Sequence, residues 1–388
     1  MRLRFAWVSI LVALCPVQAR ATIELRGGVV VEAPIESVSL EGVRVAGDEP
    51  RIIGWDSIKR VFGDAASEAA SYAAISDKAW RARLRLSRGD HALAEPLFEE
   101  LFEIYRGHGG PTALMVFEGL LRCRLREGRQ GEAAACWLEA VRLREMGVVI
   151  AGDPPMLPLL DQDTFLVGAL PPIWLPGDES ALFARSTPDA RATSSIAVRL
   201  GELYRVAACF ENGLPYVLPP PDAAVSTAAG SALVEQVVLA RVGGPDERAA
   251  ARRELEAGIV ADLGTWREVW RRVAIGRSLL REDSESARFA GVIQLLHVPA
   301  RFGRDHGYLS GIALAEAAAE LHRRGDHTGA GILKDRLAVD EPNHPALRWL
   351  EKQMQEPVDG QRSTMAPQAK EATVEPVETT PADAPQGS

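Results

Sequence analysis

Aromatic residues are scarce in this chain of 388 residues, at 6%, and cysteine occurs only four times. Alanine, leucine and arginine recur instead, and this mixture favours helices over sheets. Lys and Arg together number 44 against 53 Asp and Glu, which gives a net charge of −9. Because neutralising phosphates requires a surplus of basic side chains, this balance argues against a nucleic-acid-binding protein.

The motifs that usually carry chemistry are also missing. There is no Gly-x-x-x-x-Gly-Lys-Ser/Thr loop, no Gly-x-Gly-x-x-Gly and no Cys-x-x-Cys. The run from His108 to Pro111 is similar to the oxyanion strand of lipases, but the Gly-x-Ser-x-Gly elbow that such a site needs is absent. His322 and His327 are five residues apart and are not expected to share a helix face. We predict no catalytic residue, metal ligand or cofactor.

The first 21 residues are typical of a secretory signal peptide. Arg2 and Arg4 precede a short apolar run, Phe5–Leu14, and Ala19–Ala21 is a small-x-small cleavage site. The apolar run is too short to span a bilayer, which takes about twenty residues. We predict cleavage after Ala21 or Ala19, a periplasmic or secreted location, and a mature chain without an integral membrane span. A lipid anchor on Cys15 and an uncleaved signal are the alternatives.

Cleavage at this site leaves three cysteines, Cys123, Cys136 and Cys209. An odd number does not make a disulfide framework. A single bridge between Cys123 and Cys136 would form if the helices that flank them pack as a hairpin. The other interpretation, three buried free thiols, is the one that the sequence favours.

The C-terminal segment, residues 355–388, is rich in Pro, Thr, Glu, Gln and Ala and has almost no large apolar side chain. From Glu356 onward it carries six acidic residues and two basic ones. Such a composition cannot bury enough surface to offset a chain entropy of about 1–2 kcal/mol per residue. We therefore predict a disordered tail.

Residues 22–63 form a small β-rich module of short β-branched runs separated by glycines. Val38 and Leu40, then Val43 and Val45, alternate on either side of Glu41-Gly42, which predicts a hairpin. Ile58 and Val61 are expected to start a turn of helix. A module of about forty residues folds poorly by itself, so we expect it to pack against the helices that follow.

Residues 64–146 have the periodicity of helices and are predicted to form two helical hairpins: Tyr72–Leu86 with Leu93–Tyr105, and Thr112–Arg126 with Glu132–Glu145. Four pairs of positions are 39 residues apart: Gly89 and Gly128, Ala94 and Ala133, Phe98 and Trp137, Leu101 and Ala140. A constant spacing at core positions indicates a structural repeat.

A third copy follows near the end of the chain, in Leu314, Ala317, Ala318, Leu321, Gly325, Ala330, Leu337 and Pro342. With these offsets the three hairpins resemble tetratricopeptide repeats, over roughly 100 residues. The resemblance implies a mainly α fold, an α-α superhelix, next to the small β module and the disordered tail. Lys78, Arg81 and Arg85 depart from the apolar pattern of the family, and generic helical hairpins remain the alternative. As a whole the chain resembles exported proteins of planctomycete-type bacteria, a resemblance that implies no activity.

Between the hairpins and the C-terminal helices lies a proline-rich segment, residues 147–194, which we call the strap. Its embedded apolar residues predict an ordered segment lying over the helices and not a flexible linker. Residues 195–354 are predicted to be a second helical region, with helices over Ser195–Asn212, Ala224–Val242, Pro245–Val260, Thr265–Arg281, Ser284–His297 and Leu309–Arg324.

One pair of residues is a candidate binding site. Arg122 and Arg126 are four residues apart and share a helix face, which in the repeat register points into the groove where tetratricopeptide repeats hold peptides. Guanidinium groups suit bidentate capture of a carboxylate, although a solvated basic face would have the same pattern. We predict an exported, non-catalytic scaffold that binds a protein or peptide partner. An envelope structural or assembly factor, or a hydrolase with an inconspicuous site, are the alternatives.

Overall fold

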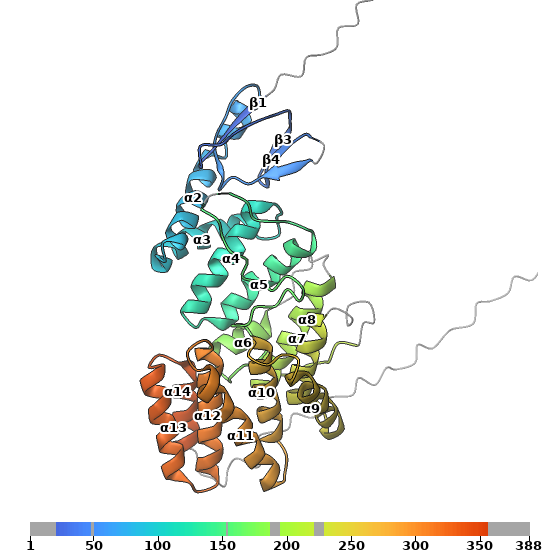
Figure 1. Ribbon diagram of the computed structural model, residues 1–388, viewed down its shortest axis with the longest axis vertical. Coiled ribbons are helices and arrows are strands. Elements are labelled where there is room, and N and C mark those ends of the chain that lie inside the picture. The colour runs from blue at the N-terminus through green and yellow to red at the C-terminus, as the bar shows by residue number, and fades with distance from the viewer. Residues whose placement is uncertain (1–20, 48–49, 153, 187–194, 221–228, 356–388) are drawn as a thin grey trace, which may run out of the picture.

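The computed structural model describes residues 21–47, 50–152, 154–186, 195–220 and 229–355. The protein is mainly helical, with two small antiparallel sheets in its N-terminal region. Figure 1 shows the sheets at one end of the long axis and the last helices toward the other. The predicted signal peptide, apart from Ala21, and the predicted tail from Glu356 onward lie outside the described residues.

The β module contains two three-stranded sheets, ordered β2-β1-β6 and β3-β4-β5. The predicted hairpin is confirmed, because Val38 pairs with Val43 and Ser39 with Gly42. The strands are β1 (Ala21–Leu25), β2 (Val30–Ala33), β3 (Ile35–Ser39), β4 (Gly42–Val45), β5 (Arg51–Ile53) and β6 (Ile58–Val61).

The helical turn expected at Ile58 and Val61 is wrong, since these residues bound strand β6. Both side chains are buried although they are three residues apart, a spacing that fits a helix. A register shift between Glu24 and Leu25 in the pairing of β1 with β6 places both on the same side of the sheet. The extra residue, Lys59, is in β6 itself, and this bulge produced the helix-like spacing of the two buried side chains.

Within the described residues, the helical segments predicted from the sequence are present, with small shifts at their ends. Residues 224–228 of the predicted helix Ala224–Val242 lie outside the described residues. The helices are α1 (Ala66–Ala70), α2 (Ala73–Ser87), α3 (His91–Tyr105), α4 (Pro111–Arg126), α5 (Gln130–Glu145), α6 (Asp178–Arg185), α7 (Ser195–Glu211), α8 (Ala229–Val242), α9 (Pro245–Ile259), α10 (Trp266–Leu279), α11 (Glu285–Phe302), α12 (Gly307–Arg323), α13 (His327–Asp340) and α14 (Pro345–Gln355).

Four of these helices, α1, α6, α11 and α14, depart from the prediction. Helix α1 precedes the first predicted hairpin. Helix α6 lies inside the strap, and α14 follows the third hairpin and packs on α12. Helix α11 continues through Pro299 to Phe302, whose side chain is buried. The free energy gained by burying the Phe302 side chain outweighs the cost of the helical hydrogen bond that Pro299 cannot donate.

The three predicted hairpins share one turn geometry. Gly89, Gly128 and Gly325 have φ of +79°, +74° and +86°, a left-handed conformation that favours glycine. In each turn the amide of the next residue donates to a carbonyl five residues earlier, as Asp90 does to Arg85. This is the Schellman helix end, so the repeated glycine marks a repeated local structure.

Apart from the turn glycines Gly89 and Gly128, the positions that recur every 39 residues are buried. Phe98, Leu101, Trp137 and Ala140 are completely inaccessible. Phe98 lies so close to Gly119 of α4 that a Cβ there would meet its ring. The ring of Trp137 also packs on Tyr204 of the following helix α7, with 4.6 Å between ring centroids.

Candidate functional site

The structure places Arg122 and Arg126, the predicted carboxylate clamp, in different environments on α4. The side chain of Arg122 is 23% exposed, lies 4.0 Å from the carboxylate of Glu118 and donates from Nη2 to the carbonyl of Leu157 in the strap. Arg126 is exposed. Arg122 is therefore already engaged by the protein's own backbone, and Arg126 alone of the pair stands open to solvent.

The strap interacts with the helices as an extended peptide would. Buried or partly buried side chains of six helices donate hydrogen bonds to its backbone carbonyls. The pairs are Arg83 with Ala151, Gly152 and Pro154, Arg122 with Leu157, Trp137 with Phe165, Trp270 with Gly168, Tyr204 with Leu170, Tyr308 with Ile173, and Arg277 with Trp174.

The apolar side chains of the strap are part of the protein core. Leu166, Leu170 and Trp174 are at most 2% exposed and belong to the main hydrophobic cluster. Over residues 147–152 and 154–186 the strap lies against the helices, and its residues 153 and 187–194 lie outside the described residues. This packing means that the helix surface to which Arg122 points is covered by a segment of the same chain.

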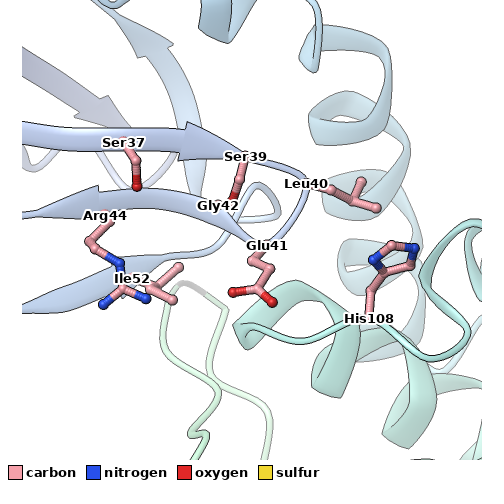
Figure 2. A pocket seen from close by; sticks show the side chains of 8 residues that line it. All are labelled: Ser37, Ser39, Leu40, Glu41, Gly42, Arg44, Ile52 and His108. Atoms are coloured by element: carbon pink, nitrogen blue, oxygen red, sulfur yellow. The ribbon is translucent and has the colours of Figure 1, made fainter. Parts of the chain in front are cut away.

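An open polar pocket lies elsewhere, between the β3-β4-β5 sheet and the loop that joins α3 to α4. Figure 2 shows its lining residues, which enclose about 380 Å³: Ser37, Ser39, Leu40, Glu41, Gly42, Arg44, Ile52 and His108. A pocket of this size is within the range of small-ligand and side-chain binding sites.

The pleat of the sheet explains which residues line the pocket. Val38 and Val43 point into the core, so their neighbours Ser37, Ser39 and Arg44 point to the opposite face. The sequence pattern predicts the hairpin but does not mark these residues as a site. The signal available was the alternation itself, which places two hydroxyl groups and a guanidinium on the outer face.

The far wall of the pocket depends on two glycines. The β3-β4 turn packs against the loop that begins with His108, and a Cβ at Gly110 would lie 2.5 Å from the carbonyl oxygen of Glu41. A Cβ at Gly109 would lie 2.7 Å from a carboxylate oxygen of the same residue. The glycines after His108, which suggested a lipase-like loop, are therefore needed for close packing.

Hydrogen bonds from the helices hold both walls in place. The hydroxyl of Tyr105 donates to the carbonyl of Leu40 at 3.2 Å, and Arg142 donates from Nη2 to the carbonyl of His108 at 2.6 Å. Burial and the nearby carboxylate of Asp56 raise the pKa of Tyr105 far above its ordinary value. Tyr105 therefore stays neutral and acts as a fixed hydrogen-bond donor.

A buried ion pair fastens the β module to the helices beside this pocket. Arg83 of α2 binds the carboxylate of Asp56, and both side chains are 2% exposed. Thr112, at the start of α4, donates to the same carboxylate at 2.9 Å. Breaking such a pair leaves an uncompensated buried charge, so it fixes the relative position of the sheet and the first hairpins.

The charges in the pocket are only partly balanced. Arg44 has no ion-pair partner within the part of the chain that the structure describes, and Glu41, in the β3-β4 turn, supplies a carboxylate to the same pocket. A second basic region surrounds Arg122 and Arg126. Burial of His91, and then the positive charges of Arg126 and Arg122 near it, lower the pKa of that histidine. Positive potential thus reaches the surface near Arg126 as well as at Arg44.

The described residues contain no group of three or more His, Cys, Asp or Glu side chains that could hold a metal ion. Cys123, Cys136 and Cys209 are free and buried. Among the helices described, none is long and apolar enough to cross a membrane.

No family model, no curated protein and no solved structure matches this chain.

Proposed function

We propose that the protein is an exported, non-catalytic scaffold that binds a protein or peptide partner. The observation that carries this proposal is the pocket of Figure 2, where the guanidinium of Arg44 lacks an acidic partner among the described residues. Ser37 and Ser39 present hydroxyl groups beside it, along one strand. A row of donors two residues apart suits an extended segment, and Arg44 suits a carboxylate on that segment.

The same pocket supports hydrolysis less well, although it contains serine, histidine and glutamate. A hydrolytic site needs a hydrogen bond between the nucleophile and its base, at about 2.6–3.2 Å. No hydrogen bond joins Ser37 or Ser39 to His108 among the described residues, and in Figure 2 His108 stands on the other side of Leu40. Binding is therefore the better-supported function.

On the helical part of the molecule, the proposed contact surface includes Arg126. It is exposed, whereas Arg122 holds the strap and contributes positive charge to the same region. The repeated turns at Gly89, Gly128 and Gly325 support a tetratricopeptide-like array, in which successive hairpins build an extended surface for partners.

Export is proposed on the first 21 residues, which combine Arg2 and Arg4, the apolar run Phe5–Leu14 and the small residues Ala19 and Ala21. Mass spectrometry of the mature protein from its native cells should find an N-terminus at Thr22 or Arg20. A mature chain that begins at Met1, or that carries a diacylglycerol on Cys15, would contradict this part of the proposal.

The binding proposal is tested by photo-crosslinking in the native cell envelope. A photo-reactive residue at Ser39 should give one discrete adduct, and the same residue at the exposed Ser87 of α2 should not. Arg44→Gln should abolish the adduct because it removes the cation from the pocket. Arg51→Gln is the matched control, since Arg51 is exposed on the neighbouring strand and does not line the pocket.

An adduct that survives Arg44→Gln, or one that Arg51→Gln weakens equally, would contradict binding at the pocket. Adducts with many different envelope proteins from both Ser39 and Ser87 would favour the second function, that of an envelope structural or assembly factor.

A further inference from the structure

Two histidines meet at the turn between α12 and α13. His322 lies in the last turn of α12 and His327 is the first residue of α13. Sequence spacing predicted that they do not share a helix face, and they indeed belong to different helices. The chain reversal at Gly325 nevertheless brings Nδ1 of one imidazole to 3.0 Å from Nδ1 of the other.

The distance between these two nitrogens is that of two ligands on one metal ion. Metal–imidazole bonds are about 2.0–2.1 Å long, and two such bonds that span this distance enclose an angle of about 95°. Tetrahedral zinc would need a separation of about 3.3 Å. An angle near 90° is that of tetragonal or square-planar coordination, which Cu²⁺ and Ni²⁺ adopt with nitrogen ligands.

The two arginines next to His322 do not direct an unpaired positive charge toward the histidine pair. Arg323 is bound to the carboxylate of Glu320, and Arg324 turns away to α11, where its guanidinium lies 5.3 Å from the ring of Phe289 and donates to the carbonyl of Glu285. His322 also lies at the C-terminal end of α12, where the helix dipole favours a positive charge.

We propose that His322 and His327 form an open two-imidazole site for a divalent transition metal, with Cu²⁺ bound more tightly than Ni²⁺ and Ni²⁺ more tightly than Zn²⁺. Both rings bind through Nδ1, and the order of affinity follows the general order for nitrogen ligands. The pair is accessible at the surface, so water or a donor from a second molecule fills the remaining coordination positions. The inference is independent of the pocket beside Arg44.

The test is a titration of the untagged full chain with Cu²⁺ in a non-coordinating buffer, followed by calorimetry and electron paramagnetic resonance. One equivalent should bind with a tetragonal spectrum that shows two equatorial imidazole nitrogens. His322→Ala and His327→Ala should each weaken this binding roughly 10²-fold, because one imidazole loses the advantage of two linked ligands. His297→Ala is the matched control, as His297 is an exposed single histidine on α11.

The variants are expected to melt as the unaltered protein does, since the His322 and His327 side chains are not in the core. The proposal would be overturned if the protein bound no Cu²⁺, or if it bound Cu²⁺ equally well in all three variants. The first result would mean that the two imidazoles only form a hydrogen bond with each other. The second would place the ion elsewhere, for example at the N-terminal amine.

Discussion

The indole nitrogen of Trp137 donates a hydrogen bond to the backbone carbonyl of Phe165, at 2.8 Å. This contact joins the second predicted hairpin to the strap, and the Trp137 ring also packs on Tyr204 of α7. A single side chain therefore links the hairpins, the strap and the second helical region. The residue that sequence spacing identified as part of a repeat also joins the two helical regions.

Replacing this side chain should strongly destabilise the protein. Trp137 is completely buried, and truncation of a large buried aromatic residue to alanine costs about 3–5 kcal/mol. We expect Trp137→Ala to lower the free energy of unfolding by about that amount in a denaturant titration. Leu157→Ala is the control and should change it by less than about 0.5 kcal/mol, because the side chain is 79% exposed. A neutral Trp137→Ala would refute both the repeat alignment and the link to the strap.

The sequence predicted local structure well where a residue type is required by the backbone itself. Gly89, Gly128 and Gly325 were recognisable because a left-handed helix end favours glycine wherever it occurs. The buried pair Phe98 and Trp137 was recognisable because its spacing repeats. Such signals depend on a few neighbouring residues and can be read without the tertiary structure.

The path of the strap and the pocket could not be predicted in this way. Tyr308 and Ile173, for example, are 135 residues apart in sequence yet form a hydrogen bond. The strap accepts most of its hydrogen bonds through backbone carbonyl groups, which every residue has. Its sequence therefore does not indicate which side chains bind it. His108 lines the pocket only because the α3-α4 loop packs on the β3-β4 turn, a tertiary contact.

A buried charge network should make the protein sensitive to acid. Glu211 of α7 binds Arg241 of α8 and Arg277 of α10, at 2.7 and 3.0 Å. Burial alone would raise the pKa of Glu211, but the charges of these two arginines outweigh it and hold the pKa below its ordinary value of 4.5. A depressed pKa stabilises the folded state above pH 4.5, and this contribution is lost as the pH falls through the folded-state pKa.

We therefore expect the free energy of unfolding to fall below pH 4.5, and Glu211→Gln to flatten that part of the pH profile. At pH 7 the same variant should lose about 3–5 kcal/mol, because the buried guanidinium of Arg241 loses its ion-pair partner, while Arg277 keeps its ion pair with Glu316. Urea titrations between pH 3 and 7 would measure both effects. Glu256→Gln, at an exposed position of α9, should follow the unaltered protein throughout; equal profiles for both variants would contradict the role of Glu211.

The three buried thiols should be inert in the folded protein. Burial raises the pKa of Cys123 and of Cys136 to about 12, and it also raises the pKa of Cys209. Since the thiolate is the reactive form, almost none is present at pH 8. Ellman's reagent should label no thiol in the native chain that begins at Thr22, and three after unfolding. A single reactive thiol after unfolding would reveal a disulfide between Cys123 and Cys136, the alternative that the sequence left open.

The two arginines of the predicted clamp should respond differently to removal of the side chain. From the sequence alone both arginines are expected to face solvent, and truncation of an exposed arginine changes the free energy of unfolding by less than about 0.5 kcal/mol. Arg122, however, donates to the carbonyl of Leu157 and lies beside the buried carboxylate of Glu118, so Arg122→Ala should cost about 1–3 kcal/mol. Arg126→Ala should change the free energy of unfolding by less than about 0.5 kcal/mol and leave the strap bound to the helices.

Denaturant titration measures the loss of stability, and limited proteolysis measures release of the strap, since cleavage near Leu157 requires its backbone to detach. We expect Arg122→Ala to be cut faster there than Arg126→Ala or the unaltered chain. Equal stability and equal cleavage rates for the two variants would mean that Arg122 does not hold the strap. Arg122 would then be available to a partner together with Arg126, as the sequence alone predicts.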